Sequence, residues 1–139
     1  MSDEVHFLSI GEASRLIKEK KLSPVEYVDA LLARIENLNP ILDAFLLVTG
    51  DQARAAAKKA ETEITAGRYK GPLHGIPFAL KDIYETKGIL TTAHSKILIN
   101  NVPDNDATSV ANLKQAGGIL LGKLATHEFA HGGPSLDLP

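Results

Sequence analysis

The stretch Gly71-Pro72-Leu73-His74-Gly75-Ile76-Pro77-Phe78-Ala79-Leu80-Lys81-Asp82 places a lysine at the end of a short apolar run, behind a segment rich in glycine and proline. Residues 76–80 are apolar and bounded by turn-forming residues, which predicts a buried strand. Burial disfavours the charged form of an amine, and a neutral lysine can act as a base. Lys81 is therefore interpreted either as a solvated lysine at a strand end or as a catalytic lysine.

The composition of the chain is that of one ordinary globular domain. Of its 139 residues, 44% are apolar and 23% are charged, which allows a packed core. The net charge of −2 is spread over interleaved acids and bases, so we expect no nucleic-acid surface. The chain has no cysteine, which excludes disulfides, thiolate metal sites and a cysteine nucleophile. Since no apolar run approaches membrane-spanning length and the sequence starts without an export signal, we expect a cytoplasmic protein with no membrane contact.

Two helix starts are readable in the first 40 residues. Ser9 and Glu12 have the spacing of a capping box, which predicts a helix over residues 10–20. Ser23-Pro24-Val25-Glu26 repeats the signal, with proline at the first helical position, and an apolar stripe at helical spacing follows it. Asn39-Pro40 is expected to end this second helix.

The rest of the chain alternates short apolar runs with helical patterns. We expect a strand over residues 44–48, then an alanine-rich helix that Asp51 caps and that runs to about residue 67. Beyond residue 68 the chain is rich in strands and turns, with a helix capped by Asp106 and a buried strand at 119–121. This alternation favours an α/β fold with a helical part at 1–67 and a strand-rich part at 68–139.

One short motif points to zinc. His127-Glu128-Phe129-Ala130-His131 fits H-E-x-x-H, in which two histidines one helical turn apart hold the metal. The motif closely follows a predicted strand, and Gly132-Gly133-Pro134 would break a helix at once. We therefore expect a turn with two exposed histidines, and no metal site.

Several segments occur in a fixed order along the chain and together resemble the N-terminal portion of the amidase signature family. That family has a mixed α/β sandwich around a large twisted sheet. The resemblance covers essentially the whole chain and implies an α/β fold with helices packed on an incomplete mixed sheet. The matching segments are Ser23-Pro24-Val25-Glu26, residues 71–82, Thr91-Thr92-Ala93-His94-Ser95, Asp106-Ala107, residues 116–123 and Glu128-Phe129-Ala130.

The resemblance also implies a chemistry that needs no cofactor. The family hydrolyses amide bonds or transfers amide nitrogen, with a lysine, a bridging serine in a cis peptide and a serine nucleophile. Leu80-Lys81-Asp82 matches the segment of the lysine, so Lys81 inherits the role of the base. The expected substrate of the complete enzyme is a small-molecule amide, whose tetrahedral oxyanion backbone N–H groups would stabilise.

Other residues are expected to shape this site or to contact substrate. The two substrate-contact candidates, His131 and Gly132, lie where the family loop approaches the substrate pocket. Lys123 follows a buried strand and is expected to be structural. The expected site-shaping residues fix the backbone around Lys81 or satisfy turn N–H groups: Gly75, Pro77, Asp82, Thr91, Thr92 and Ser95.

The family's two catalytic serines belong to a Gly/Ser-rich segment that this sequence lacks. Ser135, in Gly132-Gly133-Pro134-Ser135, is only superficially similar and is not assigned as the nucleophile. We expect the chain to be an N-terminal fragment of a longer enzyme, inactive by itself. The incomplete sheet would expose strand edges and apolar faces, so we also expect self-association.

Three alternative interpretations stay open. Ser95-Lys96-Ile97-Leu98 and Asp106-Ala107-Thr108 favour the amidase subunit of a tRNA-dependent amidotransferase, whereas the segment around Glu128 favours stand-alone amidases. A short noncatalytic interaction module would explain the missing serines. A metal-binding module built on the two histidines of the H-E-x-x-H motif ranks last.

Overall fold

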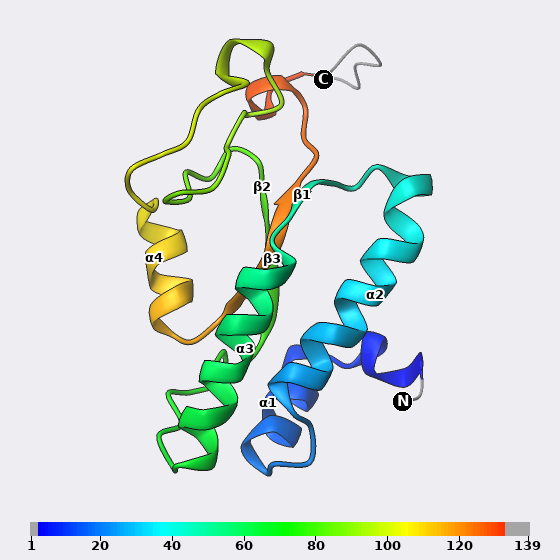
Figure 1. The fold of residues 1–139 in the computed structure, drawn as a ribbon, viewed down its shortest axis with the longest axis vertical. Helices are drawn as coiled ribbons and strands as arrows, with labels where there is room; N and C mark the ends of the chain where they lie inside the picture. The colour runs from blue at the N-terminus through cyan, green and yellow to red at the C-terminus, as the bar shows by residue number, and fades with distance from the viewer. Residues whose placement is uncertain (1–2, 133–139) are drawn as a thin grey trace.

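The computed structural model describes residues 3–132 and shows a mixed α/β fold, as predicted (Figure 1). Helices surround a sheet whose strands come from distant parts of the chain. The α-helices are α1 (Ile10–Lys18), α2 (Pro24–Leu42), α3 (Gly50–Thr65) and α4 (Thr108–Gln115). The strands are β1 (Phe45–Val48), β2 (Pro77–Lys81) and β3 (Ile119–Leu124), and the short 3-10 turns are η1 (Asp3–Phe7), η2 (Lys96–Leu98) and η3 (Glu128–Ala130).

The sheet is mixed and has the strand order β1-β3-β2. Strand β2 runs parallel to β3, with Lys81 opposite Leu124, whereas β1 runs antiparallel to β3, with Val48 opposite Gly122. The central strand is buried from Ile119 through Lys123. A strand covered on both faces reads as a continuous apolar run, which is why residues 119–121 are recognisable in the sequence.

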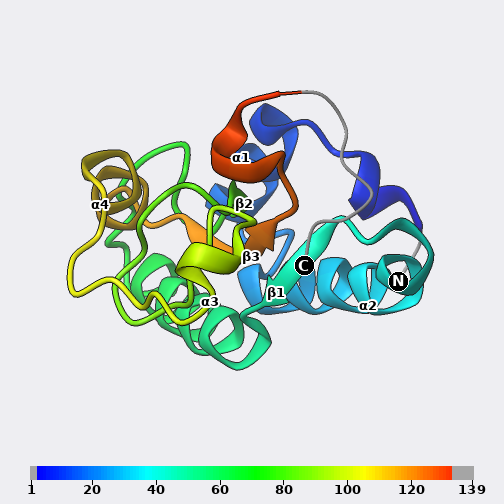
Figure 2. The same cartoon turned by 90° about the horizontal axis from the view of Figure 1, so that it is seen from above.

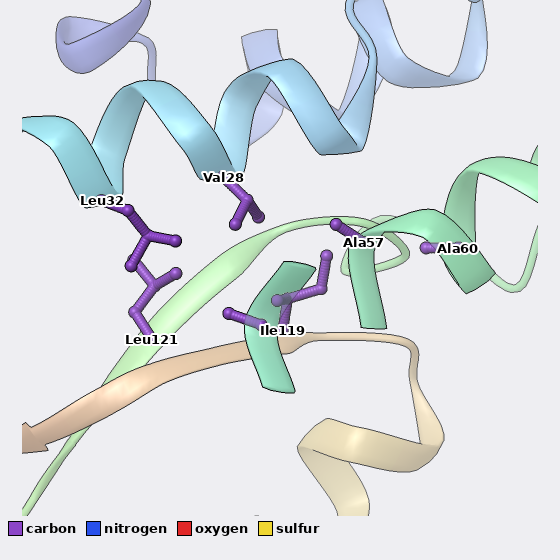
Figure 3. Close-up of a cluster of buried hydrophobic side chains, with 7 residues drawn as sticks. Val28, Leu32, Ala57, Ala60, Ile119 and Leu121 are labelled. Carbon is purple, nitrogen blue, oxygen red and sulfur yellow. The ribbon is translucent and has the colours of Figure 1, made fainter. Parts of the chain in front are cut away.

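Both faces of the central strand are covered. Helices α2 and α3 pack on one face, where the buried side chains of Val28, Leu32, Ala57, Ala60, Ile119 and Leu121 point toward one another (Figure 3). Since side chains alternate along a strand, Leu120 faces the opposite way and packs against Leu80 and Val110. Helix α4, which carries Val110, lies on the opposite side of the molecule from α2 (Figure 2).

Helix α1 joins the helical layer to the start of β2. Ser9 and Glu12 form the predicted capping box, since the Ser9 hydroxyl accepts from the Glu12 N–H and the Glu12 carboxylate accepts from the Ser9 N–H. The helix buries Ile17 against Ile64 of α3 and against Ile76, the residue before β2. The segment that leads into Lys81 is therefore packed against helices α1 and α3.

The predicted end of the second helix is wrong. Helix α2 continues through Pro40 to Leu42 and ends at Asp43, which adopts the left-handed conformation with φ of 47°. The Asn39 amide closes this end, because it accepts from the Phe45 N–H at 2.7 Å and donates to the Phe45 carbonyl at 3.0 Å. A proline in the last turn removes only one N–H donor, and these side-chain bonds hold the exit of the helix.

The two predicted aspartate caps are also wrong. Helix α3 begins at Gly50 after Thr49, whose hydroxyl donates across the fold to the Leu120 carbonyl at 2.9 Å. Helix α4 begins after Ala107, and neither helix has a side-chain cap. The Asp106 carboxylate instead accepts from Lys114 Nζ at 2.8 Å and from the backbone N–H of Lys87 at 2.8 Å. Tertiary partners therefore replace local capping at Asp106, whereas Asp51 lies exposed in the first turn of α3 and not at its cap.

Candidate active site

Lys81 is the last residue of β2 and is exposed. Its main chain is fixed, since its Cα lies opposite that of Leu124 and its carbonyl accepts from the Tyr84 N–H at 3.1 Å. Within residues 3–132 its ammonium group has no hydrogen bond or ion pair. The chain thus presents the amine at the carboxyl end of a parallel strand, on a fixed backbone and open to solvent.

The next residue, Asp82, is buried and is hydrogen-bonded through its backbone and through one carboxylate oxygen. Its N–H donates to the Leu124 carbonyl at 3.0 Å, and its carbonyl accepts from the Ala93 N–H at 2.8 Å. One carboxylate oxygen, Oδ2, accepts from both the N–H and the hydroxyl of Thr92, at 2.8 and 2.6 Å. The loop that follows β2 is therefore folded back onto the residue next to Lys81.

The other carboxylate oxygen of Asp82 faces Lys123. Lys123 Nζ lies 3.0 Å from Asp82 Oδ1, and it donates to the Thr91 hydroxyl at 2.7 Å and to the Tyr84 carbonyl at 2.9 Å. Lys123 is 0% exposed and Asp82 is 2% exposed, so water reaches neither side chain. Burial lowers the pKa of Lys123, while the carboxylate of Asp82 opposes that shift. Sequence reasoning missed this ion pair, although a lysine inside the apolar run of β3 was a visible signal.

Ser95 ties this loop to the segment after β3. Its fully buried hydroxyl donates to Glu128 Oε1 at 2.6 Å and accepts from the Ile97 N–H at 3.2 Å. A backbone bond from Phe129 N–H to the Ala93 carbonyl, 2.9 Å long, runs beside it. Because the Ser95 N–H also donates to the Thr92 carbonyl at 3.0 Å, Thr91, Thr92 and Ser95 lie together with Asp82 in one largely buried polar network at the end of the sheet.

The two substrate-contact candidates lie at the edge of the described chain. His131 and Gly132 follow η3 and are exposed, and within residues 3–132 no hydrogen bond or ion pair joins either of them to Lys81. The H-E-x-x-H segment forms no α-helix, because Phe129 and Ala130 have φ of 49° and 56°. Its two histidines are therefore not held one α-helical turn apart, and His127 is half-buried rather than exposed as predicted. No cluster of three metal-ligating side chains lies in the part of the chain that the structure describes. Ser135 lies outside the described residues.

The start of β2 is shaped by close backbone packing. Gly75 has φ of +86°, its N–H donates to the Gly117 carbonyl at 2.9 Å, and a Cβ there would meet Pro24 Cγ at 3.0 Å. Glycine is the residue that adopts this conformation without strain. Pro77 opens the strand opposite Ile119.

His74, next to Gly75, is buried among polar partners. Its Nδ1 accepts from the Lys70 N–H at 3.1 Å, so the proton is on Nε2, which donates to Glu63 Oε2 at 3.1 Å. Burial lowers the pKa of His74 and nearby Lys70 adds to the effect, while Glu63 acts in the opposite direction. The histidine therefore stays neutral at neutral pH and holds the loop that leads into β2.

Solved structures with the same architecture are amide-cleaving enzymes or their relatives. The chain superimposes on the native peptide amidase from Stenotrophomonas maltophilia with a TM-score of 0.81 and 33% identity, over 87% of this chain and 25% of that one. A vestigial protein complex, described as revealing the origins of an s-triazine catabolic enzyme, gives a TM-score of 0.84 and 32% identity over 88% and 27%. The fold thus places the chain in a class, the amidases.

The family model described as Amidase matches residues 26–135, and the chain belongs to the amidase signature family. The A subunit of the glutamyl-tRNA(Gln) amidotransferase from Geobacter metallireducens is 51% identical over 129 residues, which are 93% of this chain and 26% of that protein. The corresponding protein from Desulfatibacillum aliphaticivorans is 46% identical over 92% of this chain and 26% of its own length. The chain spans about a quarter of the length of these curated relatives.

No helix among residues 3–132 has the length and apolar character to cross a membrane.

Proposed function

We propose that this chain is the N-terminal part of an amide-cleaving enzyme and that Lys81 is its catalytic base. The observation that carries the proposal is the position of Lys81, exposed at the end of β2 and directly beside the buried Asp82 network, in a chain of the amidase signature family. A base must be accessible to its proton donor while its backbone is held in place. Lys81 meets both requirements, and the burial that favours its neutral form would come from the second part of the enzyme when it covers the end of β2.

In the proposed mechanism the neutral amine of Lys81 accepts a proton from the serine nucleophile, relayed through a bridging serine. Both serines would come from the part of the enzyme beyond this segment. The activated serine oxygen attacks the amide carbonyl, the amine leaves with a proton, and water or another acceptor releases the acyl group. The exposed end of β2 is the place where the second part of the enzyme would supply these groups, and the expected substrate is a small-molecule amide.

The proposal is tested by Lys81→Ala in the complete polypeptide, with Lys96→Ala as the control. Lys96 is also an exposed lysine, and it lies in η2 outside the Asp82 network. Since general-base catalysis contributes about 10² to 10⁴-fold, amide hydrolysis should fall by that factor in Lys81→Ala and stay unchanged in Lys96→Ala. Full hydrolysis by Lys81→Ala would remove Lys81 from the mechanism.

The names of the relatives favour one particular form of this chemistry. The two curated relatives compared above belong to glutamyl-tRNA(Gln) amidotransferases and are more similar to this chain than the solved amidases. We therefore propose, as a second candidate, that the complete protein is an amidotransferase subunit that works with partner proteins. Purification from the native cell distinguishes the two, because a stand-alone amidase is isolated by itself, whereas an amidotransferase subunit is isolated in a complex.

Self-association of the 139-residue chain remains part of the proposal. Large apolar side chains are exposed on several elements, among them Ile41 of α2 at 78% and Ile97 of η2 at 80%. Exposed apolar surface promotes association. Light scattering coupled to size exclusion should detect oligomers, and a soluble monomer would contradict the expectation.

A cytoplasmic location and the absence of direct nucleic-acid binding also remain predictions.

A further inference from the structure

Stability alone does not explain why Lys123 and Asp82 form a buried ion pair, because such pairs contribute little to the free energy of unfolding. Removing two charges from water is costly, and well-packed apolar residues of similar volume often stabilise such a site equally well or better. The pair is nevertheless fully enclosed, with Lys123 0% and Asp82 2% exposed. The location of the pair suggests a role at the proposed site, since Asp82 directly follows Lys81 in the chain.

Lys123 contacts one carboxylate oxygen of Asp82, while backbone hydrogen bonds hold the main chain of the same residue. Across the parallel ladder, Lys123 pairs with Leu80 and Leu124 pairs with Lys81. The Lys123 ammonium forms an ion pair with Asp82 Oδ1 at 3.0 Å, while Oδ2 accepts from the N–H and hydroxyl of Thr92. The ammonium also donates to the Thr91 hydroxyl and the Tyr84 carbonyl, so one buried cation ties three points of the loop after β2.

We propose that Lys123 is a positioning residue for Lys81 that acts through Asp82. The inference rests on the proposed role of Lys81 as the base. Without the ammonium, the buried charge of Asp82 has no counter-ion and keeps only the hydrogen bonds from Thr92, and the cost of that state is relieved when the side chain turns toward water. Thr92 and the Asp82 carbonyl then lose their fixed partners, and the peptide that carries Lys81 gains freedom.

This role predicts an effect on rate without an effect on substrate binding. A displacement of about 1 Å in a catalytic group can cost about 10²-fold in rate. Lys123 and Asp82 do not reach the surface, so neither touches a bound substrate. In the complete enzyme, Lys123→Met should therefore lower kcat by about 10²-fold and leave KM within about twofold.

The positioning itself is measured without any activity, by amide hydrogen exchange on the 139-residue chain. Lys123→Met should raise exchange at Thr92 and Ala93 by about tenfold or more relative to core amides such as that of Ala57, as expected when a hydrogen bond to a charged group is lost. The matched control is Lys114→Met, which removes the same charge from the exposed pair with Asp106 at 2.8 Å. The control should leave Thr92 and Ala93 unchanged.

Two results would overturn the inference. One is unchanged exchange at Thr92 and Ala93 in Lys123→Met, and the other is an equal increase at every amide, which would indicate only global destabilisation. If Lys123→Met does not fold, Asp82→Asn removes the opposite charge with little change of shape and should give the same local increase. If Lys81→Ala keeps full activity, the proposed function fails whatever the exchange shows. If Lys81→Ala is inactive while Lys123→Met keeps kcat and slow exchange, this inference alone fails.

Discussion

Gly117 offers a sharp test of how the fold supports β2. It follows α4 with φ of +89°, and a Cβ at this position would lie 2.4 Å from His74 Cδ2 and 3.1 Å from His74 Cα. The first of these distances is far shorter than any ordinary carbon–carbon contact, and His74 is 1% exposed. The ring cannot swing away without losing its bonds to Glu63 and to the Lys70 N–H. Gly117→Ala should therefore push apart α4 and the loop that leads into β2.

The loss in the free energy of unfolding expected for Gly117→Ala has two parts that can be measured separately. A left-handed backbone at a residue with a Cβ costs roughly 1–2 kcal/mol, and overpacking a filled site costs typically about 1–3 kcal/mol more. Gly67 is the matched control, because it follows an alanine at the end of α3 with φ of +80°, and a Cβ added there would meet nothing within 4 Å. Gly67→Ala carries the backbone cost alone, so the difference between the two variants isolates the clash with His74.

The assay is urea unfolding of the wild type and both variants, followed by far-ultraviolet circular dichroism. We expect a loss of about 2–5 kcal/mol for Gly117→Ala and about 1–2 kcal/mol for Gly67→Ala. Equal losses within about 0.5 kcal/mol, the usual scatter of a neutral surface change, would show that His74 is not packed against Gly117 as described.

Three further outcomes are expected. Gly122→Ala places a Cβ 2.2 Å from the Leu47 carbonyl oxygen, so it should separate β1 from β3. The free energy of unfolding in the same urea assay should fall by about 1–3 kcal/mol or more, and wild-type stability would contradict the pairing. The free energy of unfolding should fall as pH drops below about 6.5, because the lowered pKa of His74 means that the unfolded chain binds a proton that the folded chain does not. Urea titrations between pH 5 and 7.5 should show this slope and its reduction in His74→Gln, and equal slopes would refute the assignment. Lys81→Ala should change stability by no more than about 0.5 kcal/mol, since the side chain is exposed, and a larger loss by thermal melting would reveal a structural role.

The parts of the fold that the sequence predicted depend on signals a few residues apart. The capping box at Ser9 and the Ser23 cap both appear in the structure, because each cap bonds N–H groups two or three residues ahead. The apolar run of β3 was recognisable because burial on both faces leaves little alternation to confuse with a helix. The run at β2 also forms a strand, but one that is mostly half-buried and not fully buried as predicted.

The errors arise where a distant partner decides the local structure. Asp106 has the chemistry of a cap, but Lys114 and the Lys87 N–H bind its carboxylate instead. Thr49, a residue type that is common at helix starts, precedes α3, but its hydroxyl bonds a carbonyl of β3 instead of capping the helix. The buried role of Lys123 depends in the same way on Asp82, a residue on the loop after a different strand. Side-chain pairing across a sheet cannot be predicted before the strand order is known.

The order of the strands also bears on how the chain folds during synthesis. Strand β3 is made after β1 and β2, yet it is the central strand, and each of the other two pairs with it rather than with the other. Chains leave the ribosome from the N-terminus at about 5–20 residues per second. Until Ile119–Leu124 has emerged, β1 and β2 have no hydrogen-bonded neighbour and the apolar faces of α2 and α3 lack their strand. A nascent chain paused before this strand would therefore expose apolar surface, and pairing of the three strands would wait until β3 is released.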